Sequence, residues 1–247
     1  MEYRLRQYRW CWDIDQIGDV KLSDNVSDLI TLKIAALSDK NQQALKALSC
    51  FGSSANHDIV NTLSTELENL HLGCSDELVN AGLLNRNDAG YNFSHDKVLE
   101  AAVSLFATDF ERADCHRHIG MVLLDAFDKG NLECVGIVAD QCNRGLTTSE
   151  AHVAYTNMAT LNEKAAASAL KKANRESALH YSRNAMRHLP ENCWQSERDL
   201  SIRVHLTHAK SAALSEIVSG RALVARLPDI CLCACSRRCP GRGKGRY

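Results

Sequence analysis

Apolar residues recur at spacings of three and four along most of this chain, which is the period of an amphipathic helix. In the first hundred residues the pattern predicts a series of helices separated by polar or glycine-containing breaks. Several breaks offer a serine or aspartate, whose side chain accepts backbone N–H groups at a helix start. The predicted helices are residues 26–37, capped by Ser23 or Asp24; a second capped by Ser38 or Asp39 and ended by Gly52; residues 58–67; and residues 76–81.

The pattern changes between residues 83 and 106. Residues 83–86 and 91–93 are predicted as two short strands, joined by a tight turn at residues 87–90. A helix follows, and its first turn carries Ser94, His95 and Asp96. Three helices with a two-stranded β-wing and a following helix are the parts of a winged-helix module, so we expect strands only in this wing.

From Cys115 onward the spacing predicts pairs of helices, interrupted at Gly130 and Gly145 and resumed after Thr148 or Ser149. Residues 165–173 are rich in alanine, which lets a neighbouring helix approach closely. Ala178, Ala185 and Pro190 then follow at the intervals of the second helix of a tetratricopeptide (TPR) repeat, with Tyr181 and Leu189 between them. Trp194 and a helix over residues 197–219 supply a further element. The predicted fold is therefore mostly α: a winged-helix module followed by a TPR-like α-solenoid.

The last stretch differs from everything before it. The segment from Cys231 to Tyr247 holds Cys231, Cys233, Cys235 and Cys239 together with five basic residues and three glycines, and it has no apolar anchor to fold around. The four thiolates suggest zinc as an alternative, but Cys-x-Cys places neighbouring thiols on opposite sides of an extended chain. We therefore expect a disordered tail without metal. The predicted domain organisation is 1–22 linker, 23–110 winged-helix module, 111–220 TPR-like helices and 221–247 tail.

Composition adds limits on partners and location. The formal net charge is −1 with 24% charged residues, so no general basic field attracts nucleic acid or an anionic membrane. No apolar segment approaches the roughly 20 residues that cross a bilayer, and the start lacks the apolar part of a signal peptide. Most of the eleven cysteines lie singly in helical patterns, which favours reduced thiols over a disulfide scaffold. These features predict a cytoplasmic protein.

Catalytic motifs are missing from the sequence. No Gly-x-x-x-x-Gly-Lys-Ser/Thr loop occurs, and Gly243-Lys244 is followed by Gly245 where a hydroxyl belongs. Residues 135–140 resemble an apolar strand ending in a magnesium-binding aspartate, but their flanks predict a helix. Residues 115–118, Cys-His-Arg-His, are expected to form a partly exposed polar turn and to bind no metal. We expect no catalytic residues, no metal and no cofactor in this chain.

Several of these segments resemble one family. The series Leu45-Lys-Ala-Leu-Ser-Cys-Phe-Gly, Ala81-Gly-Leu-Leu and Tyr91-Asn-Phe-Ser-His-Asp-Lys-Val is similar to the region after the nucleotide-binding domain of AAA-type, STAND-like signalling ATPases. These ATPases occur in large multidomain serine/threonine and histidine kinases. The resemblance extends over roughly residues 10–220, through Cys142-Asn-Arg-Gly and Trp194. The wing helix, which is shortened and less apolar, and the tail depart from the family pattern.

The resemblance implies a role in kinase signal transduction. Residues 1–22 would then link this region to an AAA-type core that carries the nucleotide motifs. In the family a histidine near the wing contacts the phosphates of bound ADP, and His95 occupies the matching position, so ATP or ADP is implied only in the full-length context. The alternative for His95 is that it caps the helix with Ser94 and packs beside Phe93.

Three functions remain open at this point. The first is a non-catalytic regulatory and protein-interaction fragment of an AAA-type ATPase, whose partners are kinase or core domains. The second is a winged-helix DNA-binding protein, but the candidate recognition helix at residues 76–81 carries Asp76 and Glu77 and no basic residue. The third is a stand-alone helical-repeat scaffold that binds another protein.

Overall fold

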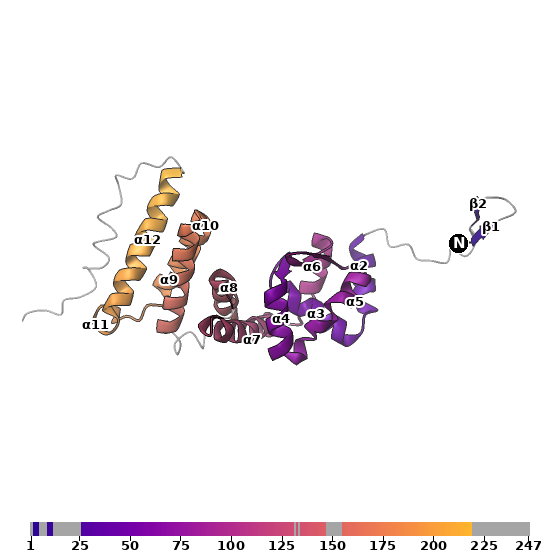
Figure 1. Ribbon diagram of the computed structural model, residues 1–247, viewed down its shortest axis with the longest axis horizontal. Coiled ribbons are helices and arrows are strands. Elements are labelled where there is room, and N and C mark those ends of the chain that lie inside the picture. Colours follow the sequence, from indigo (N-terminus) through magenta and orange to yellow (C-terminus); the bar gives the residue numbers. More distant parts are fainter. Residues whose placement is uncertain are drawn as a thin grey trace, which may run out of the picture. The chain divides into compact units, whose positions relative to one another are not determined.

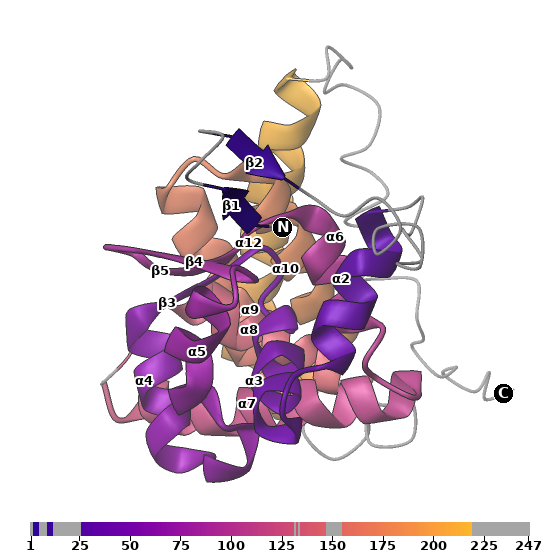
Figure 2. The same cartoon turned by 90° about the vertical axis from the view of Figure 1, so that its right-hand side faces the viewer.

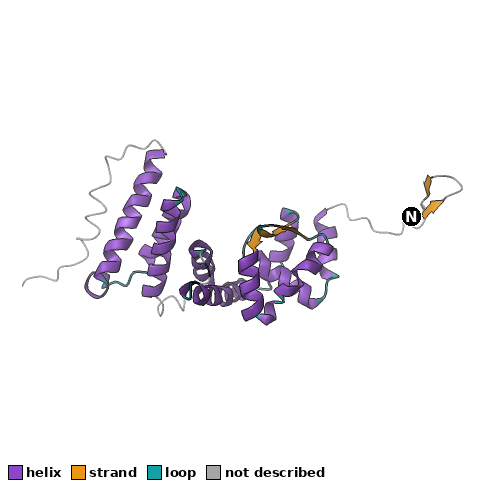
Figure 3. Cartoon of the chain, viewed as in Figure 1, coloured by secondary structure: helices purple, strands orange, loops and turns teal. Residues whose placement is uncertain are grey.

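The computed structural model describes residues 2–4, 9–11, 26–130, 132, 134–146 and 155–218, and helices dominate this part of the chain (Figures 1 and 3). The chain divides into two compact units, residues 1–115 and 116–247. The mostly α prediction is confirmed. The tail beyond residue 220, with its four cysteines, lies outside the described residues, as do the caps proposed at residues 23–24 and 148–149.

The helices of the first unit start where the sequence offers caps. Ser38 Oγ accepts a hydrogen bond from the Asn41 N–H at 3.3 Å, and Asn56 Oδ1 accepts one from the Ile59 N–H at 2.8 Å. The helices are α2 Val26–Ala35, α3 Asp39–Ser49, α4 His57–Glu66, α5 Ser75–Asn80 and α6 Asp96–Val103, with short 3-10 turns at Glu68–Leu70 and Leu72–Cys74. Their core is leucine-rich, with Leu45, Leu48, Leu63, Leu78, Leu83 and Leu84 fully buried.

A three-stranded antiparallel sheet lies beside α4 and α5 (Figure 2). Its strands are β3 Ser54–Asn56, β4 Leu84–Asn87 and β5 Gly90–Phe93, in the order β3-β5-β4. The two wing strands were expected, but β3 was not. Its Ser-Ala-Asn sequence has no β-branched or aromatic residue, and it is extended because it pairs with the free edge of β5.

The wing turn follows from asparagine and glycine chemistry. Asn87 Oδ1 accepts hydrogen bonds from the backbone N–H groups of Ala89 and Gly90, at 3.0 and 2.9 Å. A second departure from the expected strands lies at the N-terminus, where β1 Glu2–Arg4 pairs antiparallel with β2 Arg9–Cys11. The expectation that strands occur only in the wing was therefore wrong at two places, and part of the predicted 1–22 linker is a hairpin.

The second unit is built from helices that pack on their neighbours in sequence. Alpha-helix α7 Asp109–Asp128 begins in the first unit, and its residues from His116 onward belong to the second. The remaining helices are α8 Val135–Gly145, α9 Tyr155–Lys171, α10 Arg175–Arg187, α11 Cys193–Ser196 and α12 Arg198–Val218. Helix α10 packs against both α9 and α12, and α8 packs against α9. Within the described ranges, no helix has the length and apolar character to cross a membrane.

Gly90 is the tightest point of the sheet, because a Cβ atom there would lie 2.1 Å from the carbonyl oxygen of Ala55 in β3. We predict that Gly90→Ala separates β3 from β5 and lowers the free energy of unfolding by roughly 2–4 kcal/mol. Urea unfolding followed by circular dichroism measures the change. Gly73→Ala is the matched control, since a Cβ at Gly73 meets nothing within 4 Å. Equal effects of the two substitutions would contradict the close approach at Gly90.

Candidate functional site

A tight turn between α9 and α10 sets the start of α10, which carries a basic surface of the second unit. The Asn174 N–H donates to the Ala169 carbonyl at 2.9 Å, and the Ala173 N–H donates to the Leu170 carbonyl at 3.1 Å. These two bonds form a Schellman motif, in which the residue after the helix takes the left-handed conformation. Ala173 fills that position with φ +55°, and Asn174 then caps α10 by accepting from the Ser177 N–H at 3.1 Å.

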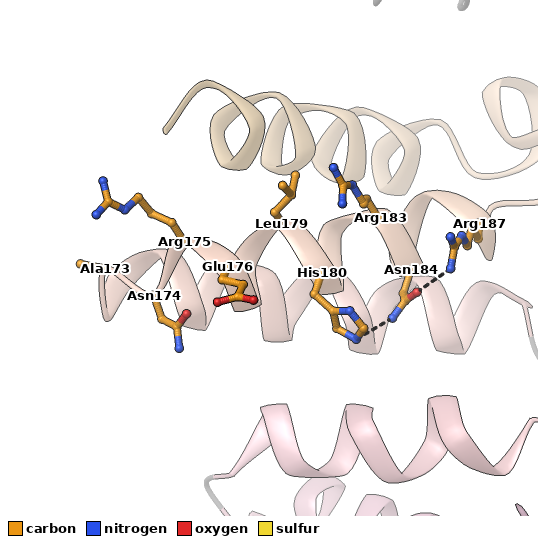
Figure 4. Close-up of a pocket in the computed structure, with 9 residues that line it drawn as sticks. All are labelled: Ala173, Asn174, Arg175, Glu176, Leu179, His180, Arg183, Asn184 and Arg187. Carbon is orange, nitrogen blue, oxygen red and sulfur yellow. Dashed lines mark hydrogen bonds between the residues drawn. The ribbon is translucent and has the colours of Figure 1, made fainter. Parts of the chain in front are cut away.

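An open hollow of about 620 Å³ follows the outer face of α10 from this turn (Figure 4). Three arginines contribute positive charge, and Glu176 is the only carboxylate among the residues that line it. The lining is Ala173, Asn174, Arg175, Glu176, Leu179, His180, Arg183, Asn184 and Arg187. We call this surface the α10 hollow. Its charge favours an anionic partner.

Side chains at the far end of the α10 hollow are joined to one another. Arg187 Nη1 donates to Asn184 Oδ1 at 3.3 Å, and Asn184 Nδ2 lies 3.2 Å from His180 Nε2 (Figure 4). The amide nitrogen carries only donors, so this contact requires His180 Nε2 to act as the acceptor. A guanidinium and an amide held by one helix in this way can receive a carboxylate or phosphate group, but they include no nucleophile.

The opposite face of α10 is buried and fixes its rotation. Ala178 and Ala185 are fully buried, and Tyr181 reaches α8, where its hydroxyl donates to the Gly136 carbonyl at 3.2 Å. Burial raises the pKa of Tyr181, and the neighbouring Asp140 carboxylate raises it further; burial also raises the pKa of Asp140 itself. Because the raised pKa keeps the Tyr181 hydroxyl protonated, it can donate this bond to α8. The bond and the buried alanines together fix the rotation of α10, so its arginines lie on the exposed face.

His95 lies at the start of α6, as the sequence predicted. It occupies the N-cap position, and its Nδ1 accepts a hydrogen bond from the Lys97 N–H at 3.0 Å. Ser94 takes no part in the cap, since its Oγ donates to the Gly82 carbonyl at 3.0 Å. Helix capping by the imidazole is therefore observed, and contact with a nucleotide stays a prediction.

The Cys115–His118 segment was expected to be a partly exposed polar turn, and it is a helical turn of that kind. Cys115 and Arg117 are partly exposed and His118 is exposed, so the burial of His116 is the one departure. The segment lies within α7, and His116 is only 2% exposed, with Nδ1 placed 2.7 Å from Gln141 Oε1 of α8. Residues 135–140 likewise lie on α8 and form no strand that would end in a magnesium-binding acid. Across the described ranges, no three His, Cys, Asp or Glu side chains gather as metal ligands.

Two buried polar pairs were missed by sequence reasoning. One is His116 with Gln141, and the other is Asn143 of α8 with Asn162 of α9. The two asparagine amides exchange hydrogen bonds of 2.8 and 2.9 Å, and Asn162 is fully buried. The available signal was a polar residue on an otherwise apolar helical face, since such a residue needs a partner when it is buried.

Comparison of the chain with protein-family models, with curated proteins and with solved structures finds no match. The functional argument therefore depends on the chain's own residues and on the resemblance described above.

The left-handed Ala173 gives a direct test of the turn that presents the α10 hollow. An L-residue with a Cβ costs roughly 1–2 kcal/mol in this conformation, and glycine relieves that cost at some expense in chain entropy. We predict that Ala173→Gly raises the free energy of unfolding by roughly 0.5–1 kcal/mol, whereas Ala173→Val lowers it because valine is β-branched. Urea unfolding of both variants measures the difference. A lower free energy of unfolding in Ala173→Gly would contradict the left-handed conformation of Ala173 in this turn.

Proposed function

We propose that this chain is a non-catalytic regulatory and protein-interaction part of an AAA-type signalling ATPase of the kind found in multidomain kinases. In this proposal the first unit is a winged-helix module that responds to a nucleotide-binding core, and the second is a TPR-like array that binds a protein partner. The chain itself neither binds nor hydrolyses ATP, and it acts in the cytoplasm.

The order of elements in the first unit supports the winged-helix part. Helix α3, strand β3, helices α4 and α5, and strands β4 and β5 follow in sequence, and β3 pairs with β5 rather than with β4. A winged-helix module has this succession, with its first strand added beside the last. The third strand therefore strengthens the proposal, although the sequence pointed to a wing of two.

Buried small residues support the TPR-like part. Asn162, Ala165, Ala166 and Ala169 repeat the spacing of the Trp-x2-Leu-Gly-x2-Tyr pattern in the first helix of a TPR, and all four are buried in α9. Ala178 and Ala185 follow in α10. The chain departs from that pattern by having small or polar residues in place of Trp, Leu and Tyr.

The α10 hollow is the observation that carries the interaction role. Arg175, Arg183 and Arg187 line it together with a single carboxylate, Glu176, so its net charge is positive in a chain of formal charge −1. We infer that the partner presents an acidic segment to it. The alternative is that the chain is a stand-alone helical-repeat scaffold, which differs from the first proposal only in ancestry. In that case too, the α10 hollow would bind an acidic segment of a protein partner.

DNA binding by the winged helix is less well supported. Asp76 of α5 accepts hydrogen bonds from Arg86 of the wing and from the Tyr91 hydroxyl, both at 3.1 Å. The wing arginine is thus engaged by a carboxylate on the helix that would enter the major groove. The Asp76 carboxylate on this helix would repel the DNA phosphates, and its pairing with Arg86 leaves that cation less able to bind them.

The interaction role predicts binding of acidic peptides. A fluorescein-labelled decapeptide of alternating Glu and Ser should bind at low salt with a Kd of roughly 10–100 µM, weakening as salt screens the charges. Arg183→Glu with Arg187→Glu should weaken binding at least about tenfold in fluorescence anisotropy. The matched control is Arg198→Glu with Arg203→Glu, which makes the same charge change on α12 outside the hollow. Equal losses in both double variants, or equal binding of a Lys–Ser decapeptide, would contradict a specific acidic site.

The regulatory role is tested at His95. His95→Ala should lower the free energy of unfolding of this chain by about 0.5–1.5 kcal/mol through loss of the cap, whereas His95→Asp keeps an acceptor and the cap. When the chain is joined to an AAA-type core that binds ADP, both variants should release ADP roughly ten- to hundredfold faster, since each loses a hydrogen bond to phosphate. Stopped-flow release of a fluorescent ADP measures this. Parental release from His95→Asp would show that His95 serves only as a cap.

A further inference from the structure

Two cysteines that are far apart in sequence meet inside the first unit. Cys50 follows the last turn of α3, Cys115 lies on α7, and their sulfur atoms are 3.7 Å apart. Cys50 is 1% exposed, whereas Cys115 is partly exposed. A disulfide has a sulfur–sulfur bond of about 2.05 Å, so the two atoms must approach by roughly 1.7 Å.

The contact between α3 and α7 is repeated one helical turn earlier. Lys46 lies four residues before Cys50, and Glu111 lies four residues before Cys115; the Lys46 ammonium and the Glu111 carboxylate form an ion pair. The two contacts therefore join one face at the end of α3 to one face at the start of α7. A second contact fixes the ammonium, because Lys46 Nζ is 4.8 Å from the centre of the Phe106 ring. The ion pair holds the two sulfur atoms in register.

The surroundings also activate one of the two thiols. The Cys50 thiol donates a hydrogen bond to Cys115, which lowers the pKa of Cys115, and the Lys46 ammonium lowers it further against the effects of burial, Asp114 and Glu111. A thiolate is the nucleophilic form of cysteine. Cys142 on α8 is the opposite case, because burial raises its pKa to about 11. Cys115 is thus the partly accessible, activated member, and Cys50 is the buried partner beside it.

We propose that Cys50 and Cys115 are a redox modification site, which hydrogen peroxide converts into a reversible disulfide between α3 and α7. The Cys115 thiolate attacks one peroxide oxygen, the O–O bond breaks, and the released hydroxide takes a proton to become water. The sulfur of Cys50 then attacks the sulfenic sulfur of Cys115, the S–O bond breaks, and a second water leaves with the Cys50 proton. The two thiols lose two electrons, which the peroxide gains, and a dithiol reductant reverses the change.

The direct test is a disulfide map of the full chain after treatment with hydrogen peroxide. Trypsin with a glutamate-specific protease separates Cys50 from Cys74, because cleavage after Glu66 falls between them. We expect more than half of Cys115 in a peptide linked to Cys50, and we expect tris(carboxyethyl)phosphine to release it. The same treatment in urea should not favour this pair. A map without the Cys50–Cys115 link, or an equal yield from the unfolded chain, would overturn the proposal.

Thermal unfolding gives an independent readout. A bond closing this long loop should raise the Tm of the oxidised parent by at least about 5 °C over the reduced protein. Cys115→Ser should abolish that rise, and Cys142→Ala, the matched control, should retain it. If Cys115→Ser fails to fold, the disulfide map of the parent still decides the matter. A rise of equal size in Cys115→Ser would place the oxidised site elsewhere and contradict the proposal.

Discussion

Close packing of small side chains holds the second unit together. Ala159 of α9 and Ala185 of α10 meet Leu200 and Val204 of α12 in one buried cluster, and Ala165, Ala166 and Ala169 extend the alanine face of α9. Alanines let helix backbones approach, so the contact is dense and tolerates little rotation of either helix. With the alanine face of α10 turned inward, Arg175, Arg183 and Arg187 have only the outer face available. The α10 hollow is thus a consequence of the packing on the other side of the same helix.

Buried polar pairs add specificity to this packing. The Asn143–Asn162 pair joins α8 to α9, and the His116–Gln141 pair joins α7 to α8. Each pair is satisfied only when both helices are in one register, because a shift would leave a buried amide or imidazole without its partner. The Tyr181 hydroxyl adds a similar bond between α10 and α8. Helix α8 is therefore joined to α7, α9 and α10 by directional contacts in addition to apolar burial.

The first unit depends on a different constraint, which is the approach of two backbones at Gly90. That approach lets Ser54–Asn56 join the wing, and the strand leads directly into the Asn56 cap of α4. Strand β5 then ends one residue before Ser94 and His95, which begin α6. Strand β5, the His95 cap and the start of α6 are therefore joined with no loop between them. The proposed regulatory role would use this continuity to pass a change in the wing to α6.

The sequence by itself determined the helical class, the wing turn and most helix limits, since these follow from local physics. Apolar spacing predicts helices, Ser38 marks a cap, and Asn87 with Gly90 marks a turn; the structure has all of these. The inward faces of Ala178, Ala185 and Tyr181 were also predictable from their spacing. The tertiary structure alone decided the rest. Strand β3 exists because β5 offers it an edge, His116 is buried because Gln141 lies opposite, and the Cys50–Cys115 contact joins residues 65 positions apart. Such contacts depend on which surfaces meet after folding, and no local pattern of residue types encodes that choice.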